Sequence, residues 1–142
     1  GGTNTATLYI PVVLYGEDPR FSVLSQDPAL TTELAEAFAE HGTVSGCGFD
    51  ELADSSFDIV INGTSASLKG EVPPLPDSLL NPGALCYDMM YAARPTAFCQ
   101  WAAALGADTR DGLGLLVEQA AEAVELWRGV RPDTATVIAE LR

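Results

Sequence analysis

The chain has 142 residues, which is the size of one ordinary domain with a buried core. Twenty acidic residues against seven basic ones give a formal net charge of −13, which argues against partners such as nucleic acids and anionic membrane surfaces. The sequence shows neither a membrane-spanning apolar run nor a secretory leader, and its three cysteines with one histidine favour reduced thiols in the cytoplasm over disulfides or zinc.

The first half of the chain predicts short strands that alternate with helices. Residues 1–15 are ambiguous, because their β-branched content favours a strand, whereas Pro11 disfavours a central strand and a buried helix fits equally well. After a turn over 16–20, the predicted elements are a strand over 21–25, a helix over 28–41, a strand over 43–47, a helical turn over 49–53 and a strand over 57–61. Asp27 and Pro28 form the start of the first helix, as N-cap and first helical residue.

The second half continues the same alternation after a long loop. The predicted elements are a proline-interrupted loop over 62–76, a buried strand over 84–89, a helix over 95–105, a short strand over 107–110 and helices over 111–129 and 132–141. Gly129 stands where a C-terminal cap belongs, and Pro132 prevents continuation of that helix. A long loop directly after a buried strand is often functional.

This alternation predicts one α/β domain over 1–142, with a doubly wound, mostly parallel sheet and helices on both faces. Ligands of such sheets bind beyond the carboxyl ends of the strands. Small and polar residues occupy those ends at 25–27, 62–65, 88–91 and 111–112. No serine there has a second histidine or a nearby lysine to activate it, and acid–base pairs of carboxylates have no distinctive spacing, so the residues alone predict no more than a nucleotide- or metabolite-binding domain.

The helix over 111–129 combines a buried face with one polar exception. Its apolar residues recur at three- and four-residue intervals: Leu113, Leu116, Val117, Ala120, Val124 and Trp127. Gln119 lies within this run, and it fits either the solvent side of the helix or a contact with a polar ligand. We also predict that Trp101 and Trp127 pack on helix faces, that Cys86 and Cys99 are buried, and that Lys69 is a solvated loop residue.

Three segments in this order resemble the shikimate dehydrogenase family. They are DIVINGTS over 58–65, YDMMY over 87–91 followed by PTAF over 95–98, and DGLGLLVEQAA over 111–121. The likeness extends from Phe57 to Arg142 and more loosely back to Gly1. It implies the C-terminal, Rossmann-like domain of that family, which holds NADP, whereas the whole family members reduce 3-dehydroshikimate to shikimate with NADPH.

The resemblance also implies roles for individual residues. The cofactor-binding positions carried over are Gly2, Ser25, Gln26, Asp27, Asn62, Thr64, Ser65, Met89 and Gly112. Tyr91 and Gln119 would contact a shikimate-like substrate. The family's catalytic lysine and aspartate belong to its N-terminal domain and have no match in this sequence, so we expect this chain alone to be inactive.

Two departures from the family pattern leave alternatives open. Where the family usually has Asn-Arg-Thr, with the arginine facing the 2′-phosphate of NADP, this chain has Ser25-Gln26-Asp27, which would also suit NAD; Asp27 fits a helix cap equally well. Gly1-Gly2 matches the end of the family's Gly-Ala-Gly-Gly turn. Alternatively, Gly2 to Thr5 match its Gly-x-Asn-Thr-Asp segment, with Ala6 in the place of the aspartate. On the first match the initial strand is missing, and the open sheet edge would permit a homodimer. A non-catalytic binding module and a ligand-free homologue are the alternative functions.

Overall fold

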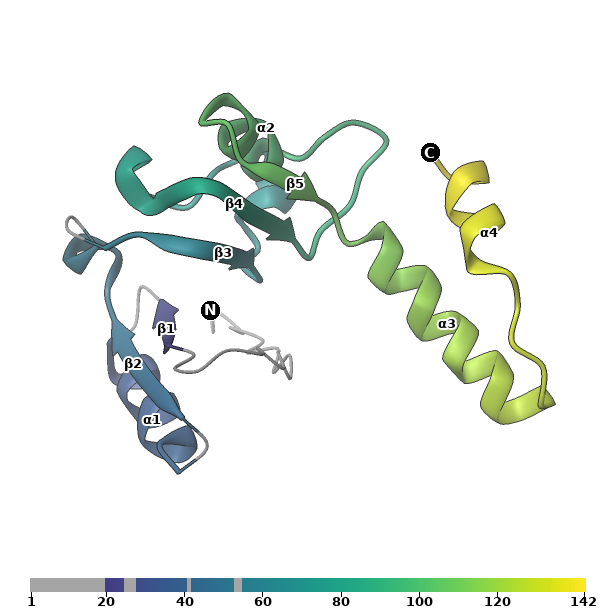
Figure 1. Cartoon of the computed structure of the whole chain (residues 1–142), viewed down its shortest axis with the longest axis horizontal. Coiled ribbons are helices and arrows are strands. Elements are labelled where there is room, and N and C mark those ends of the chain that lie inside the picture. The colour runs from purple at the N-terminus through teal and green to yellow at the C-terminus, as the bar shows by residue number, and fades with distance from the viewer. Residues whose placement is uncertain (1–19, 25–27, 41, 53–54) are drawn as a thin grey trace. The chain divides into compact units, whose positions relative to one another are not determined.

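The structure is a computed structural model, and it describes residues 20–24, 28–40, 42–52 and 55–142 (Figure 1). The expectations for residues 1–19 and 25–27 lie outside the described residues. The chain divides into two compact units, of which the first contains the residues up to Ser56 with Pro74–Leu79, and the second contains Phe57–Pro73 with Leu80–Arg142. Within the described residues no helix has the length and apolar character that crossing a membrane requires.

The first unit is a parallel β-α-β arrangement. Strand β1 (Arg20–Leu24) pairs in parallel with β2 (Thr43–Cys47), and helix α1 (Pro28–Phe38) packs against β2. The predicted strands are confirmed, and α1 begins at Pro28, where the missing N–H costs no hydrogen bond. The helix ends earlier than predicted, at Phe38, whose side chain is 40% exposed.

Close packing of α1 on β2 depends on a glycine. A Cβ atom at Gly46 would lie 2.3 Å from the carbonyl oxygen of Thr31, which is a backbone atom of α1. The predicted helical turn after β2 is present as the 3₁₀ helix η1 (Phe49–Glu51), and the Glu51 side chain accepts a hydrogen bond from the Gly48 N–H at 2.9 Å. A larger residue at position 46 would separate the helix from the strand.

The second unit is built on a three-stranded parallel sheet. Its strands are β3 (Phe57–Asn62), β4 (Leu80–Asp88) and β5 (Asp108–Arg110), in the order β3-β4-β5. The predicted α/β class with parallel strands is confirmed, although β4 begins four residues earlier than expected. The buried apolar residues of this unit are Val60, Ala84, Cys86, Phe98, Cys99, Ala102, Leu113, Val117 and Ala121.

Short helices shape the connections around β4. The predicted loop over 62–76 contains the 3₁₀ helix η2 (Ala66–Lys69), on which Lys69 is exposed as predicted, and η3 (Asp77–Leu79) precedes β4. Helix α2 (Ala97–Ala104) contacts β4 and β5. It begins two residues after the predicted start because Thr96 is its N-cap, with Oγ1 accepting from the Cys99 N–H at 3.2 Å.

Helix α3 (Leu113–Arg128) projects from the sheet of the second unit, and α4 (Thr134–Glu140) runs back beside it (Figure 1). Gly129, with φ of 68°, caps α3 as predicted. The predicted buried face is correct only near the sheet, where Leu113 and Val117 are buried. Trp127 is 79% exposed, so the prediction that it packs is wrong: α3 has by then passed beyond the body of the unit, and helical spacing alone does not report that.

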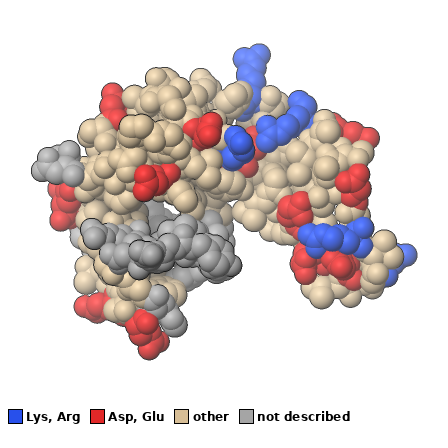
Figure 2. Space-filling view, in the orientation of Figure 1, with Lys and Arg blue, Asp and Glu red and all other residues tan. Residues whose placement is uncertain are grey.

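An arginine fastens the chain after α3 back onto that helix. The guanidinium of Arg131 lies 2.8–2.9 Å from carboxylate oxygens of Glu118, Glu122 and Glu125, which follow one side of α3. In Figure 2 basic and acidic side chains lie next to each other on the α3–α4 hairpin. Hydrogen bonds from Thr134 and then Arg131 hold the pKa of Glu118 below its ordinary value of 4.5.

We expect acidification to loosen the α3–α4 hairpin. Because the pKa of Glu118 is lowered on folding, its contribution to stability is present above the ordinary value of 4.5 and is lost as the pH falls through the lower, folded value. An NMR titration of the Glu118 carboxyl and the α4 amides checks this. In Arg131→Gln the Glu118 pKa should rise, and an unchanged pKa would show that the ion pairs do not form in solution.

Candidate functional site

The carboxyl ends of β3 and β4 bring the central polar residues of the second unit together. Asn62 ends β3 and lies in register beside Asp88, which ends β4, and Asp111-Gly112 follow the end of β5. The sequence-based expectation that polar residues converge at this edge is therefore confirmed for the second unit. The predicted positions Gly2, Ser25, Gln26 and Asp27 lie outside the described residues.

Asp88 is the centre of this cluster. Its side chain is completely buried and accepts four hydrogen bonds. Oδ1 accepts from Asn62 Nδ2 at 3.2 Å and from the Met90 N–H at 3.1 Å. Oδ2 accepts from the hydroxyls of Ser67 and Thr96, both at 2.6 Å. A buried carboxylate is tolerated only with such a complete set of donors.

Asn62 shapes the turn that follows β3. Its side chain is buried, with 4% of its surface exposed. Oδ1 accepts two hydrogen bonds from Thr64, one from its N–H at 3.1 Å and one from its hydroxyl at 2.8 Å. Nδ2 donates to Ser67 Oγ at 3.1 Å as well as to Asp88. Both ends of the amide are thus used inside the protein, and the exposed part of the turn is Gly63, Thr64 and Ser65.

The segment after β4 is held between its neighbours by backbone contacts. The Met89 N–H donates to the Asn62 carbonyl at 3.0 Å, and the Gly112 N–H donates to the Met90 carbonyl at 3.0 Å. A Cβ atom at Gly112 would lie 2.0 Å from the Met89 carbonyl oxygen, so this approach requires a glycine. Met89, Asn62 and Gly112 are therefore neighbours, as the predicted cofactor site requires.

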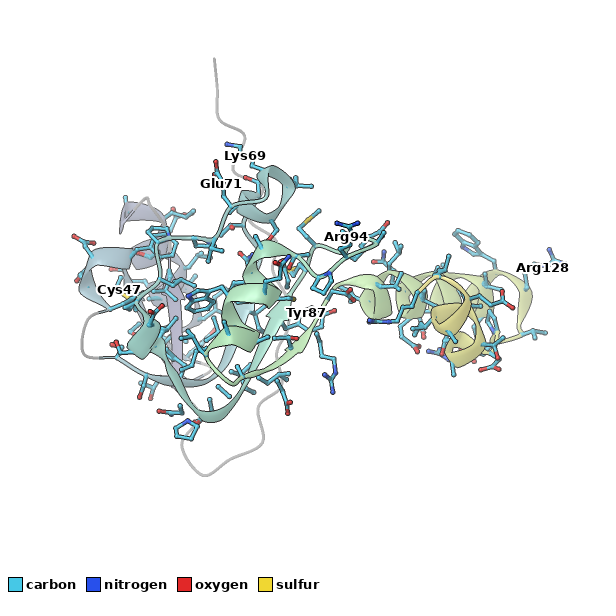
Figure 3. The ribbon with its side chains drawn as sticks, turned by 90° about the horizontal axis from the view of Figure 1, so that it is seen from above. Cys47, Lys69, Glu71, Tyr87, Arg94 and Arg128 are labelled. Carbon is cyan, nitrogen blue, oxygen red and sulfur yellow. The ribbon has the colours of Figure 1, made fainter. Side chains whose placement is uncertain are left out.

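A pocket of about 570 Å³ opens beside this cluster, entirely within the second unit. It is lined by parts of η2, of the β4–α2 connection and of α2, including Ser67, Met90, Tyr91, Arg94, Thr96 and Gln100. Arg94 is the only charged side chain among the lining residues, and Figure 3 shows it projecting from the loop between β4 and α2. In a chain of charge −13, such a pocket can admit an anionic group at its rim.

The two predicted substrate contacts fall in different places. Tyr91 lines the pocket and is 47% exposed. Gln119 is exposed on α3 and is not among the residues that line the pocket, which agrees with the solvent-side interpretation of its spacing. The described residues contain no group of three or more His, Cys, Asp or Glu side chains that could hold a metal ion.

Sequence reasoning missed the roles of Asp88, Ser67 and Thr96. Asp88 was recognised only as part of a motif at the end of a strand. An acidic residue at the end of an apolar strand is a usable signal, because a carboxylate next to a core residue such as Cys86 must find donors nearby. Ser67 and Thr96 could not be found that way, since they lie 21 and 8 residues from Asp88 in the sequence.

The sequence of this chain is similar to that of a known protein family. The family model for the shikimate 5′-dehydrogenase C-terminal domain matches residues 112–142. The shikimate dehydrogenase (NADP(+)) of Cellvibrio japonicus is 62% identical over 111 residues, which cover 78% of this chain and 40% of that protein.

Solved structures agree. An Ael1 enzyme from Pseudomonas putida has 40% identity and a TM-score of 0.73, covering 84% of this chain and 44% of that one. Shikimate 5-dehydrogenase of Thermus thermophilus, solved with NADP(H) and shikimate, has 25% identity and a TM-score of 0.68, covering 83% of this chain and 43% of that one.

Parallel strands linked by crossovers, with polar groups gathered at their carboxyl ends, define an α/β domain of the Rossmann-like class. Sequence then identifies the family. The chain belongs to the shikimate dehydrogenase family and resembles its C-terminal domain. It spans about half the length of the curated relatives that it matches, with shares from 39% to 51%.

Proposed function

We propose that residues 1–142 are the cofactor-binding domain of a shikimate dehydrogenase-like oxidoreductase, which in the intact family reduces 3-dehydroshikimate to shikimate with NADPH. The observation that carries the proposal is the meeting of the turn after β3, the segment after β4 and Gly112 at one edge of a parallel sheet. The identity of 62% with a relative named for NADP(+) supports this cofactor class.

The described residues fit a dinucleotide at this edge. Gly112 has no Cβ, which keeps the turn before α3 against the Met89 backbone. Thr64 and Ser65 are exposed on the turn after β3, with the Thr64 hydroxyl donating to Asn62 Oδ1 at 2.8 Å, and Met89 is half-buried. The Gly112 N–H donates to Met90 and its carbonyl accepts from the Leu116 N–H, so a cofactor contact at Gly112 would use the second lone pair of that carbonyl.

When bound, the nicotinamide cofactor supplies the hydride. Asn62, Thr64, Ser65, Met89 and Gly112 would hold it. The family resemblance also assigns Gly2, Ser25, Gln26 and Asp27 to cofactor binding. Asn62 would act mainly by shaping the turn, because its amide is already satisfied within the protein.

Tyr91 and Gln119 are the proposed contacts to a shikimate-like substrate. The Tyr91 phenol lies on the pocket with about half its surface free, which suits hydrogen bonding to a polyol. No residue of this chain is assigned to proton transfer, because the family's lysine and aspartate come from its other domain.

We further propose a cytoplasmic location and a homodimer formed through an open sheet edge. The cysteines support the first point: Cys86 and Cys99 are buried, the three thiols are free, and burial raises the pKa of Cys86 to about 11, which makes it unreactive. Light scattering tests the second point, and a monodisperse monomer would exclude the dimer.

Titration of the chain with NAD and NADP by calorimetry tests the cofactor assignment. Because Gln26 is neutral and Asp27 anionic, we expect NAD to bind at least as well as NADP. The variant Gln26→Arg should raise the affinity for NADP relative to NAD by about tenfold, the value of one charge-assisted hydrogen bond to phosphate. Failure of both dinucleotides to bind would refute the proposed function, and strong selectivity for NADP in the unchanged chain would refute only the preference.

Shikimate oxidation by this chain alone is expected to stay at the background rate with either dinucleotide. The physical reason is the lack of a positioned lysine, since Lys69 is the only lysine and it lies exposed on η2. The assay follows reduced cofactor by absorbance, with Lys69→Ala as the control for adventitious catalysis. Turnover that Lys69→Ala does not reduce would mean that other residues of this chain suffice for the reaction.

A further inference from the structure

Asp88 lies directly behind the pocket of the second unit. Three of its four hydrogen-bond donors, Ser67, Met90 and Thr96, also line that pocket. Asp88 itself is 0% exposed and cannot touch a ligand in the pocket. Any effect it has on binding must therefore pass through these three residues.

The two carboxylate oxygens serve different segments. Oδ1 holds the Met90 N–H at 3.1 Å and the Asn62 amide at 3.2 Å, which fixes the segment after β4 to the end of β3. Oδ2 holds the Ser67 and Thr96 hydroxyls at 2.6 Å, which fixes η2 and the start of α2. All four lone-pair positions of the carboxylate are in use, so one side chain links the separate walls of the pocket.

We propose that Asp88 is a positioning residue: by holding η2, which follows Thr64 and Ser65, and Met90, which follows Met89, it sets the two segments of the cofactor edge at the spacing that a bound dinucleotide requires. The inference rests on the proposed function for the identity of the ligand. The coupling between the two walls is a property of the ligand-free protein and can be measured separately.

Asp88→Asn distinguishes the hydrogen bonds to Oδ1 from those to Oδ2, because it changes only one of the two oxygens. The amide oxygen can remain where Oδ1 is and still accept from Met90 and Asn62. In the opposite orientation the NH₂ group of the new asparagine would face the Met90 N–H and the Asn62 NH₂ group, which are both donors. The new NH₂ group then faces the Ser67 and Thr96 hydroxyls, which lose their charged acceptor and can only accept from it. The variant therefore weakens the hold on the η2 wall while it keeps the Met90 bond.

Ser67→Ala weakens the same contact by a second route. It removes one hydroxyl donor to Oδ2, together with an acceptor of Asn62 Nδ2, and leaves Asp88 and Met90 in place. In the Asp88→Asn background the Ser67 hydroxyl no longer donates to residue 88, so the same substitution should have a smaller further effect. The exposed Asp58 on β3 accepts one bond, from Asn81, and Asp58→Asn is the matched control.

The experiment compares the whole chain with Asp88→Asn, Ser67→Ala, their double variant and Asp58→Asn. Amide NMR spectra without ligand report the positions of Met90 and of residues 64–70, and NADP titrations report affinity. We expect Asp88→Asn and Ser67→Ala each to shift the 64–70 amides and weaken NADP binding by about five- to tenfold, with the Met90 shift largely kept. The double variant should show less than the sum of the two single effects, and Asp58→Asn should match the unchanged chain.

Equal NADP affinity across all variants, despite moved amides, would overturn the proposal by showing that Asp88 only stabilises the fold. Unmoved 64–70 amides in both single variants would overturn the coupling itself. If the unchanged chain binds neither NADP nor NAD, the proposed function fails, and the ligand-free spectra still decide whether Asp88 sets the walls. If Asp88→Asn does not fold, Ser67→Ala alone gives the same decision.

Discussion

Asp88→Ala is expected to lower the free energy of unfolding of the second unit by about 3–5 kcal/mol. The substitution removes a fully buried acceptor of four hydrogen bonds. It leaves the Met90 N–H, the Asn62 amide and the hydroxyls of Ser67 and Thr96 without that acceptor, and buried donors without partners are costly. Domains are stable by only about 5–15 kcal/mol, so this loss is a large share of the total.

Urea unfolding followed by Trp101 fluorescence measures that loss. Trp101 lies on α2 with its ring 5.6 Å from that of Phe98, and α2 is capped by Thr96, a partner of Asp88. A Trp127→Phe background removes the signal of the exposed indole on α3. The matched control is Asp58→Ala, an exposed carboxylate with one partner, which should cost less than about 1 kcal/mol. Equal losses at positions 58 and 88 would contradict the central role of Asp88.

Local signals in the sequence were sufficient for most of the secondary structure. The apolar run of β3, the proline at the first position of α1 and the glycine after α3 each act over a few residues, and each marks its element correctly. The parallel arrangement also followed, because strands that alternate with helices need crossovers.

Properties that depend on distant neighbours could not be predicted in this way. Helical spacing assigned Trp127 and Leu113 to one face of α3, but burial depends on what lies opposite, and only Leu113 lies against the body of the second unit. The Asp88 cluster joins residues up to 26 positions apart in the sequence. The predicted site residues Met89 and Gly112 were brought together through a family resemblance, and spacing gave no reason for their contact.

Gly112→Ala is expected to destabilise the second unit by about 2–3 kcal/mol and to weaken dinucleotide binding. The backbone of Gly112, with φ of −74° and ψ of −1°, is open to any residue, so the penalty is purely steric. A Cβ atom there would lie 2.0 Å from the carbonyl oxygen and 2.7 Å from the carbonyl carbon of Met89. These are backbone atoms, so the Met89 segment must move and the bond from the Gly112 N–H to the Met90 carbonyl, now 3.0 Å, must lengthen.

Gly114→Ala is the matched control for Gly112→Ala, because it makes the same chemical change two residues further on. A Cβ atom at Gly114 meets nothing within 4 Å, and the residue lies inside α3, where alanine is favoured over glycine by up to about 1 kcal/mol. We therefore expect opposite signs in urea unfolding, with Gly114→Ala neutral or stabilising. If Gly112→Ala were as stable as Gly114→Ala and bound dinucleotide equally well, the close approach of Met89 to the turn before α3 would not constrain the site. A loss at position 112 alone would show that steric fit, and not helix propensity, requires the glycine.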